Sequence, residues 1–354
     1  MVPQKRLVVI GGGSYAGSSL LRWVTSPPSL QVLTHNGIQL AGLVSNHPDA
    51  IWNEIAAATP QFQISSRSQA TDLLKSANLV WIASRCDRHL NDLKHVLIFD
   101  AVVLCEKPIA PVSVEPALIN ELLASSNSHV KVGFQLPLHA RFSYLRNRIG
   151  ELNGLKRLRM TDLRQFDPAD WLAKRSDVDF SVPSGILAEL GCHYIHAACR
   201  LLLGDKWSVQ HVIIEKVQLT CDTHSGVDHS VQAWLRIAGV AVELELSWHS
   251  AIPDRIKQIA AYADRGKVIA NILPPTWPMV TYRVQEADGR EIMTEHTSRT
   301  ADDPTLGQLV ALVNHRSPRF AAMTDGREAI EVLKVIGRMY DHAKTSGPER
   351  TFSV

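Results

Sequence analysis

Short apolar runs recur through the first 135 residues, and each has the length of a buried strand. The runs are Leu7–Ile10, Ile38–Val44, Leu79–Ala83, Ala101–Leu104 and Val130–Phe134. Apolar residues with helical spacing follow the first run, at Leu20, Leu21 and Val24. Continuous apolar strands that alternate with helices are typical of a parallel sheet with both faces covered. The pattern predicts an α/β domain with a doubly wound parallel sheet over residues 1–135.

From about residue 155 the pattern changes to strands in series. Seven segments have this character: LKRLRMTDLRQF, HVIIEKVQL, HSVQAWLRIA, VAVELELSW, IKQIAAYA, KVIANIL and MVTYRVQEA. Val242, Leu244 and Leu246 alternate with Glu243 and Glu245, which is typical of a sheet with one wet face. Helical spacing occurs at 185–203, 306–315 and 326–343. We expect an α+β domain with a mostly antiparallel sheet over residues 136–354, its last helix returning towards the domain junction.

Composition narrows the class of protein. The chain has 354 residues, of which 45% are hydrophobic and 20% charged, as in ordinary globular proteins with two domains. A net charge of +2 without a long basic run argues against a nucleic-acid surface. No apolar stretch approaches the roughly 20 residues of a membrane helix. Five cysteines without paired spacing fit reduced thiols, so we expect a cytoplasmic protein with no structural metal.

A glycine-rich turn follows the first apolar run in RLVVIGGGSYAGSSLLRWV. A strand, a glycine turn and a helix in this order are typical of a dinucleotide-binding site, where the backbone approaches the pyrophosphate and helix N–H groups bind it. The candidate cofactor residues are Gly11, Gly12, Gly13, Ser14, Tyr15 and Gly17. The three glycine positions of the dinucleotide-binding motif can be aligned with this turn in two ways. One alignment uses Gly11, Gly13 and Gly17, and the other uses Gly12, Ser14 and Gly17. The alternative is a glycine turn without a ligand.

The end of the second strand bears on the choice between NAD and NADP. An acidic residue at this point binds the ribose hydroxyls of NAD. Here the chain has Ser45, Asn46 and His47, which would not repel a 2′-phosphate. These three residues therefore favour NADP(H) over NAD(H). A polar loop that does not discriminate is the alternative, and Asp49 could restore a preference for NAD.

A charged pair, Glu106 and Lys107, follows the fourth run in CEKPIA and precedes Pro108. Ligands of doubly wound sheets bind beyond the carboxyl ends of the strands. We therefore expect this pair to face the nicotinamide. The alternative is a surface ion pair at the end of a strand.

These motifs resemble those of the glucose-fructose oxidoreductase/inositol dehydrogenase (Gfo/Idh/MocA) family. The resemblance implies an N-terminal Rossmann domain and a C-terminal α+β domain with a large open sheet that carries the substrate. In the family a Thr-Pro-Asn turn follows the fourth strand, which corresponds here to the run Leu79–Ala83, with a histidine three residues later. Here the turn is Ser84-Arg85-Cys86, and His89 is the histidine. Ser84, Arg85 and His89 are thus expected at the cofactor, and Arg85 in place of proline adds a cation there.

A second group of polar residues lies in SGILAELGCHYIHAACRLLLG. On an α-helix, Glu189, His193 and His196 share one face because they are spaced i, i+4 and i+7. The family has an aspartate, a glycine, a histidine and a second aspartate here, so Glu189 and His196 are departures. The resemblance implies that His193 is an acid or base, oriented by Glu189. A metal site and a polar seam that only packs are the alternatives.

The resemblance implies an NAD(P)-dependent oxidoreductase that transfers hydride between nicotinamide and a hydroxyl or carbonyl carbon of a sugar, polyol or similar small molecule. Lys107, Glu189 and His193 are the catalytic candidates, and Gln135, Trp171, His193 and His196 are the substrate candidates. An imine or another conjugated compound as the substrate, or a non-catalytic nucleotide-binding regulator, is the alternative. An open sheet face also predicts a homo-oligomer, a dimer or tetramer.

Overall fold

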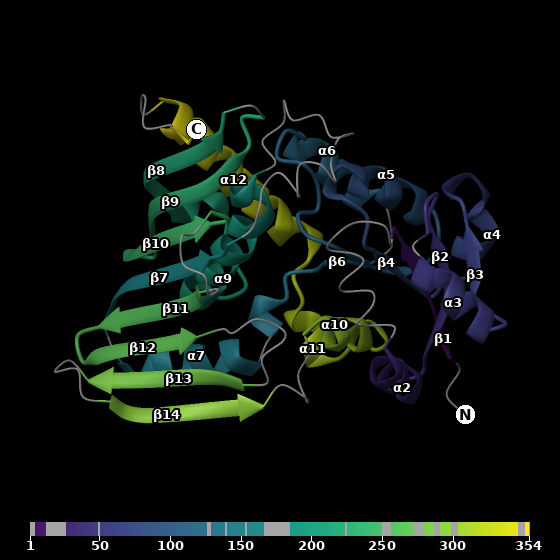
Figure 1. Ribbon diagram of the computed structural model, residues 1–354, viewed down its shortest axis with the longest axis horizontal. Coiled ribbons are helices and arrows are strands. Elements are labelled where there is room, and N and C mark those ends of the chain that lie inside the picture. The colour runs from purple at the N-terminus through teal and green to yellow at the C-terminus, as the bar shows by residue number, and fades with distance from the viewer. Residues whose placement is uncertain are drawn as a thin grey trace. The chain divides into compact units, whose positions relative to one another are not determined.

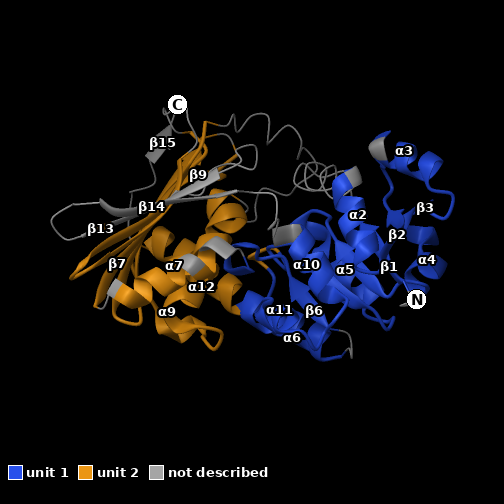
Figure 2. Cartoon of the chain, turned by 90° about the horizontal axis from the view of Figure 1, so that it is seen from below, with its two compact units in different colours: residues 1–110, 114–138, 304–330 blue, residues 111–113, 139–303, 331–354 orange. Residues whose placement is uncertain are grey.

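The computed structural model describes most of the chain (Figure 1). The described residues are 4–11, 26–48, 50–125, 129–138, 140–152, 154–165, 185–223, 225–249, 256–271, 279–286, 291–298, 304–345 and 351–353. The chain divides into two compact units, shown in Figure 2. The first unit comprises residues 1–110, 114–138 and 304–330, and the second comprises residues 111–113, 139–303 and 331–354.

Within the described part of the first unit, six parallel strands form one sheet in the order β3-β2-β1-β4-β5-β6. The strands are β1 (Lys5–Ile10), β2 (Ile38–Val44), β3 (Gln63–Ser65), β4 (Leu79–Ile82), β5 (Val102–Cys105) and β6 (Val130–Val132). This is the strand order of dinucleotide-binding domains, with the order reversing beside β1. The predicted doubly wound parallel sheet is confirmed. Its central strands are buried, as their continuous apolar runs predict.

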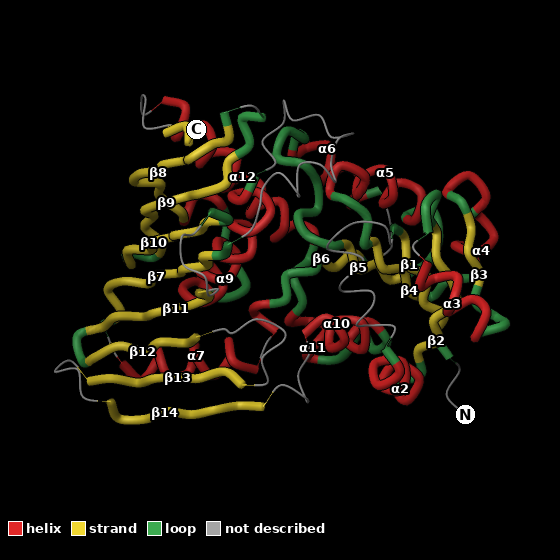
Figure 3. The backbone as a smooth tube through the Cα atoms, viewed as in Figure 1, coloured by secondary structure: helices red, strands yellow, loops and turns green. Residues whose placement is uncertain are grey.

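Helices cover both faces of this sheet (Figure 3). One face carries α5 (Cys86–Val96) and α6 (Pro116–Ala124), and the other carries α2 (Pro27–His35), α10 (Pro304–Leu312) and α11 (Pro318–Ala322). Other helices among the described residues of the unit are α3 (Ala50–Ala58), η1 (Arg67–Gln69), α4 (Thr71–Lys75) and η2 (Leu136–Leu138). Leu309, Leu312 and Phe320 join the buried cluster formed by the strands. Residues 304–330 therefore belong to the core of the first unit, although they follow the second unit's sheet in sequence.

The second unit contains a mixed sheet, with nine strands among the residues described. Their order is β14-β13-β12-β11-β7-β10-β9-β8-β15. The strands are β7 (Leu155–Leu163), β8 (Val212–Asp222), β9 (Asp228–Ile237), β10 (Val240–Ser247), β11 (Ile256–Ala263), β12 (Gly266–Asn271), β13 (Met279–Glu286), β14 (Glu291–Ser298) and β15 (Thr351–Ser353). Neighbours are antiparallel except β7 with β10 and β8 with β15. The predicted α+β fold is confirmed, and β14 and β15 are additions.

One face of the second sheet carries the helices α7 (Ala140–Leu152), α9 (Cys192–Leu203) and α12 (Gly326–Thr345), shown in Figure 2. The π-helical turn η3 (Leu187–Gly191) runs directly into α9, and the short η4 (Val209–His211) precedes β8. Val242, Leu244 and Leu246 are buried, as the alternation in β10 predicts. Glu245 and Arg159 pair at 2.6 Å on the opposite face of the sheet.

Across the described ranges, none of the helices combines the length and apolar composition required to cross a bilayer.

Candidate functional site

The turn after β1 begins with a glycine that no other residue could replace without strain. Gly11 has a φ of +94°, where side chains are disfavoured. A Cβ at this position would lie 2.5 Å from both the amide nitrogen and the Cα of Ser84. Gly11 thus allows the turn after β1 to pack directly against the backbone of Ser84, which follows β4. Gly12, Gly13, Ser14, Tyr15 and Gly17 lie outside the described residues.

At the end of β2, the predicted NADP residues form a polar edge. Ser45 is buried and its Oγ accepts a hydrogen bond from the backbone N–H of His47, at 3.2 Å. Asn46 and His47 are exposed, and Asn46 Oδ1 accepts from the backbone N–H of Arg67, at 3.1 Å. This contact brings a cation from beyond β3 beside the end of β2. Asp49, the residue that could favour NAD, lies outside the described residues.

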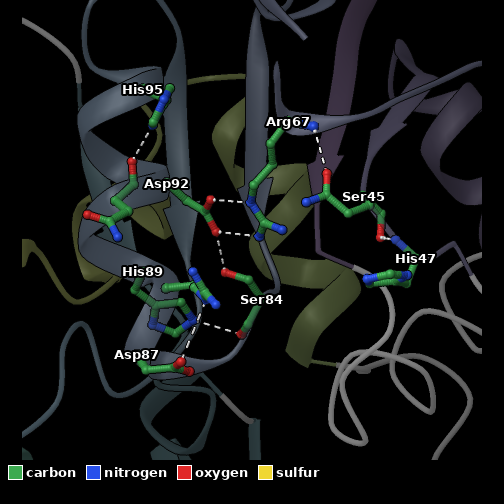
Figure 4. Close-up of polar contacts among 11 residues, drawn as sticks. Ser45, His47, Arg67, Ser84, Asp87, His89, Asp92 and His95 are labelled. Atoms are coloured by element: carbon green, nitrogen blue, oxygen red, sulfur yellow. Dashed lines mark hydrogen bonds and ion pairs between the residues drawn. The ribbon is translucent and has the colours of Figure 1, made fainter. Parts of the chain in front are cut away.

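Arg67 belongs to a network centred on a buried carboxylate (Figure 4). Asp92 on α5 is 4% exposed and accepts two hydrogen bonds from the Arg67 guanidinium, at 2.9 and 3.0 Å. Its Oδ2 also accepts from the Ser84 hydroxyl at 2.6 Å. The Asp92 hydrogen bond raises the pKa of Arg67 further, so the guanidinium stays charged. Because Ser84 also packs against Gly11, the network connects the ends of β1 and β4 with the segment after β3.

Neither Arg67 nor Asp92 is among the site residues expected from the sequence. No motif marks either residue, and they are 25 positions apart in the chain. Arg67 lies two residues after β3, a three-residue strand that is not among the apolar runs expected from the sequence, so its position after a predicted strand does not reveal it either.

His89 is buried between two carbonyl groups. Its Nδ1 lies 2.7 Å from the Pro108 carbonyl oxygen, and its Nε2 lies 2.9 Å from the Ser84 carbonyl oxygen. The side chain is 1% exposed. These contacts link the turn after β4 to the turn after β5, which contains Lys107. The structure gives His89 a role in holding the two turns together, and direct contact with the cofactor stays a prediction.

Arg85 folds back onto its own helix. Its Nε and Nη2 each lie 3.1 Å from a carboxylate oxygen of Asp87, in the first turn of α5. The side chain keeps 21% exposure. The cation that replaces the family's proline is therefore partly neutralised by Asp87.

Glu106 and Lys107 directly follow β5, at the carboxyl edge of the parallel sheet. The Glu106 N–H donates to the Ile82 carbonyl at 2.8 Å, which extends the ladder between β4 and β5. Its side chain accepts a hydrogen bond from Trp81 Nε1 at 3.1 Å. A Cβ on Gly133 would lie 2.9 Å from Glu106 Oε2, so this glycine leaves room for the carboxyl group. Burial raises the pKa of Glu106, while the Lys107 charge and the Trp81 bond oppose the shift.

Lys107 is partly buried, and Gln135 lies at the same edge of the sheet, in the loop that follows β6. The backbone ladder continues to this loop, because the Gly133 N–H donates to the Cys105 carbonyl at 2.8 Å. The first unit thus brings the described candidates Gly11, Ser45, Ser84, Lys107 and Gln135 to the carboxyl ends of its strands.

The second unit carries the remaining candidates on η3 and α9. Glu189 and His193 are half-buried, whereas the residues between them, 190–192, are buried. Glu189 lies in a π-helical turn, so its angular spacing to His193 differs from that of an α-helix. His196 is 0% exposed. Trp171 lies outside the described residues, and the substrate roles of His193 and His196 stay predictions.

The described residues contain no group of three or more His, Cys, Asp or Glu side chains that could hold a metal ion. Glu189, His193 and His196 therefore do not form such a site. Lys107 and His193 belong to different units, and their meeting over one ligand stays a prediction.

Residues 5–134 match the model of the Gfo/Idh/MocA family, described as an oxidoreductase family with an NAD-binding Rossmann fold. The resemblance expected from the motifs is confirmed over this part of the chain. None of the curated proteins matches the sequence.

Solved structures of similar fold include KijD10, a 3-ketoreductase from Actinomadura kijaniata in complex with NADP and TDP-benzene. Its TM-score is 0.71 at 16% identity, covering 96% of this chain and 98% of that chain. An oxidoreductase from Pseudomonas syringae has a TM-score of 0.72 at 16% identity, covering 98% of both chains. A putative oxidoreductase from Klebsiella pneumoniae has a TM-score of 0.68 at 17% identity, covering 97% and 94%. At these identities the likeness shows a shared fold.

The raised pKa of the half-buried Glu106 predicts a specific pH dependence of stability. Because its pKa is raised above the ordinary 4.5, the folded chain binds this proton more tightly than the unfolded chain. The favourable contribution is complete below pH 4.5 and is lost as the pH rises through the folded-state pKa. Glu106→Gln keeps an acceptor for Trp81 and removes the charge. As the pH rises through this window, the free energy of unfolding of Glu106→Gln should therefore increase relative to that of the natural chain, by up to about 1.4 kcal/mol per pH unit.

Urea unfolding of both proteins over a pH series measures this difference, with exposed Glu121→Gln on α6 as the control. Parallel pH profiles for Glu106→Gln and the natural chain would show that the folded environment does not favour the protonated Glu106.

Proposed function

We propose that this chain, whose residues 5–134 carry the NAD-binding Rossmann fold of the Gfo/Idh/MocA oxidoreductases, is an NADP(H)-dependent dehydrogenase or reductase. Its reaction would transfer hydride between nicotinamide and a hydroxyl or carbonyl carbon of a sugar, polyol or similar small molecule. The observation that carries the proposal is the position of Lys107. It follows β5 at the carboxyl edge of the parallel sheet, the edge that also holds Gly11 and Ser84. Ligands of such sheets bind at this edge.

The residues at this edge fit a dinucleotide. Gly11 has a positive φ and begins the glycine-rich turn after β1, and this turn would hold the phosphates. Ser45, Asn46 and Arg67 would hold the adenosine side. When bound, the cofactor supplies the hydride chemistry, and the protein supplies binding, orientation and charge.

NADP(H) is favoured over NAD(H) by the charges at the end of β2. The described residues 45–48 include no carboxylate, and the Arg67 backbone is bonded to Asn46. Asp92 holds the Arg67 guanidinium by Nε and Nη2, and the side chain keeps 34% exposure. A cation held in this position would favour a 2′-phosphate, since arginine suits phosphate recognition.

Lys107 would donate a hydrogen bond to the substrate oxygen and stabilise negative charge that develops there. Glu106 is fixed by Trp81 and Gly133, and its neighbouring backbone would hold Lys107 in place. The His89 contacts with the carbonyl groups of Ser84 and Pro108 restrain the same turn from the other side.

His193 would take or give the proton of the substrate hydroxyl, because an imidazole changes charge near neutral pH. Glu189 would set its tautomer. Their partial exposure among buried neighbours supports this role, since an acid or base must reach the substrate.

The sugar assignment rests on fold-level similarity to a 3-ketoreductase in complex with NADP, and on the family. We also propose a cytoplasmic homo-oligomer, a dimer or tetramer. The face of the second sheet opposite α7, α9 and α12 supports self-association: it carries Trp234 opposite Glu243 and Tyr262 opposite Arg157.

The test of the proposed function is oxidation of NADPH at 340 nm in the presence of keto sugars, with cyclic imines and keto acids as comparison classes. Turnover of a keto sugar with NADPH supports the proposal. NADPH binding without turnover of any compound would instead indicate a nucleotide-binding regulator.

Replacing His193 with alanine should lower kcat by about 10²–10⁴-fold, because a positioned acid or base contributes on this scale. Steady-state kinetics measures the change, with the exposed His211→Ala in the same unit as control. An effect smaller than a few-fold would remove His193 from the proton-transfer role.

Replacing Arg67 with glutamine should weaken NADPH binding by about 10- to 100-fold and NADH binding much less. A hydrogen bond to a charged group contributes about 1.5–3 kcal/mol, and the variant leaves the Asp92 carboxylate without its cation. Fluorescence titration with both cofactors measures this, with exposed Arg88→Gln on α5 as control. Equal losses of affinity for NADPH and NADH would mean that Arg67 affects cofactor binding only by stabilising the fold, without contacting the 2′-phosphate.

A further inference from the structure

The helical segment that carries Glu189 and His193 begins without a cap of its own. The first N–H groups of a helix have no acceptor within the helix. Ile186 occupies the N-cap position, and its apolar side chain makes no capping hydrogen bond. The acceptors for these N–H groups must therefore come from elsewhere in the second unit.

Asp228, at the start of β9, supplies the first acceptor. Its Oδ2 accepts a hydrogen bond from the Leu187 N–H at 2.8 Å, and the Gly185 backbone N–H also bonds to the carboxylate. A methyl group on Gly185 would collide with this carboxylate, so glycine is required at the approach to the helix. A carboxylate at a helix N-terminus is also favoured by the helix dipole.

Tyr340, on α12, completes the cap. Its hydroxyl donates a hydrogen bond to Asp228 Oδ1 at 2.8 Å and accepts one from the backbone N–H of Ala188. Burial, followed by the Asp228 charge, raises the pKa of Tyr340 well above 10.0, so the phenol keeps the proton that it donates. Both side chains are almost completely buried, at 3% and 5% exposure.

The position of this cap gives it a functional meaning. Glu189 lies one residue beyond Ala188, inside the π-helical turn, and His193 follows one turn later. Single π-helical turns occur frequently at functional sites. A capped first turn fixes where Glu189 projects and where α9, the helix that carries His193, begins.

We propose that Asp228 and Tyr340 are positioning residues, which form a remote N-cap that holds Glu189 and His193 in their reactive geometry. This inference rests on the proposed function for its catalytic consequence. The cap itself depends only on contacts within the second unit.

The first experiment measures the cap without any substrate. Hydrogen–deuterium exchange at residues 185–190 should become at least about tenfold faster in Tyr340→Phe and in Asp228→Asn, because each change removes an acceptor or donor of the cap. The matched control is Tyr194→Phe. Tyr194 is also buried, and its hydroxyl donates to the buried Asp162 at 2.8 Å from the first turn of α9. Unchanged exchange at 185–190 in Tyr340→Phe would overturn the cap.

The second experiment measures the catalytic consequence in the full chain. Tyr340→Phe should lower kcat by about 10- to 100-fold, since misplacement by about 1 Å can cost this much. The Kd for NADPH should stay within about twofold, because the cap lies in the second unit. Tyr194→Phe should lower kcat much less. An equal loss of kcat in both variants would show that Tyr340 only supports the fold.

The two readouts separate failure of this inference from failure of the proposed function. In one outcome, hydrogen exchange is faster in Tyr340→Phe, and the natural chain oxidises NADPH with none of the compound classes. This result would support the cap and reject the oxidoreductase. Normal turnover in Tyr340→Phe, together with faster exchange, would reject the positioning role while leaving the oxidoreductase intact.

Discussion

The carboxyl edge of the first sheet depends on one buried carboxylate. Asp92 binds the Arg67 guanidinium and the Ser84 hydroxyl, and Ser84 packs on Gly11. An unpaired buried carboxylate would be costly, so its three hydrogen bonds are a condition for folding this edge. The ends of β1 and β4 and the segment after β3 are held together as a result. A rigid edge of this kind allows a short turn such as Glu106-Lys107 to place a charge accurately.

The two units fix the positions of their candidate site residues in different ways. The first holds its candidate residues on turns that follow parallel strands, and ladder hydrogen bonds and His89 join those turns. The second holds Glu189 and His193 on one helical segment, whose start is fixed by side chains from β9 and α12. In both units, buried polar groups that are fully hydrogen-bonded locate the partly exposed residues. Such networks are more specific than apolar packing, which tolerates small shifts.

The sequence predicted the fold class well, because both sheets are marked by periodicity. Continuous apolar runs indicate the parallel sheet, and the alternation from Val242 to Leu246 indicates the second. Position in the parallel sheet also located Gly11 and Lys107. The pairings of Arg67 with Asp92 and Asp228 with Tyr340 join residues 25 and 112 positions apart, which no local pattern encodes. Glu189 lies in a π-helical turn, where the angular spacing to His193 differs from that of the α-helix expected from the sequence.

We propose that the Lys107 ammonium and the His193 imidazole, contributed by different units, act on the same substrate oxygen. The most direct measurement is a crystal structure of the chain with NADP and a sugar analogue bound. We expect Lys107 Nζ and a ring nitrogen of His193 both at hydrogen-bond distance, about 3 Å, from the analogue oxygen nearest nicotinamide C4. A structure in which Lys107 and His193 line different clefts would contradict the account.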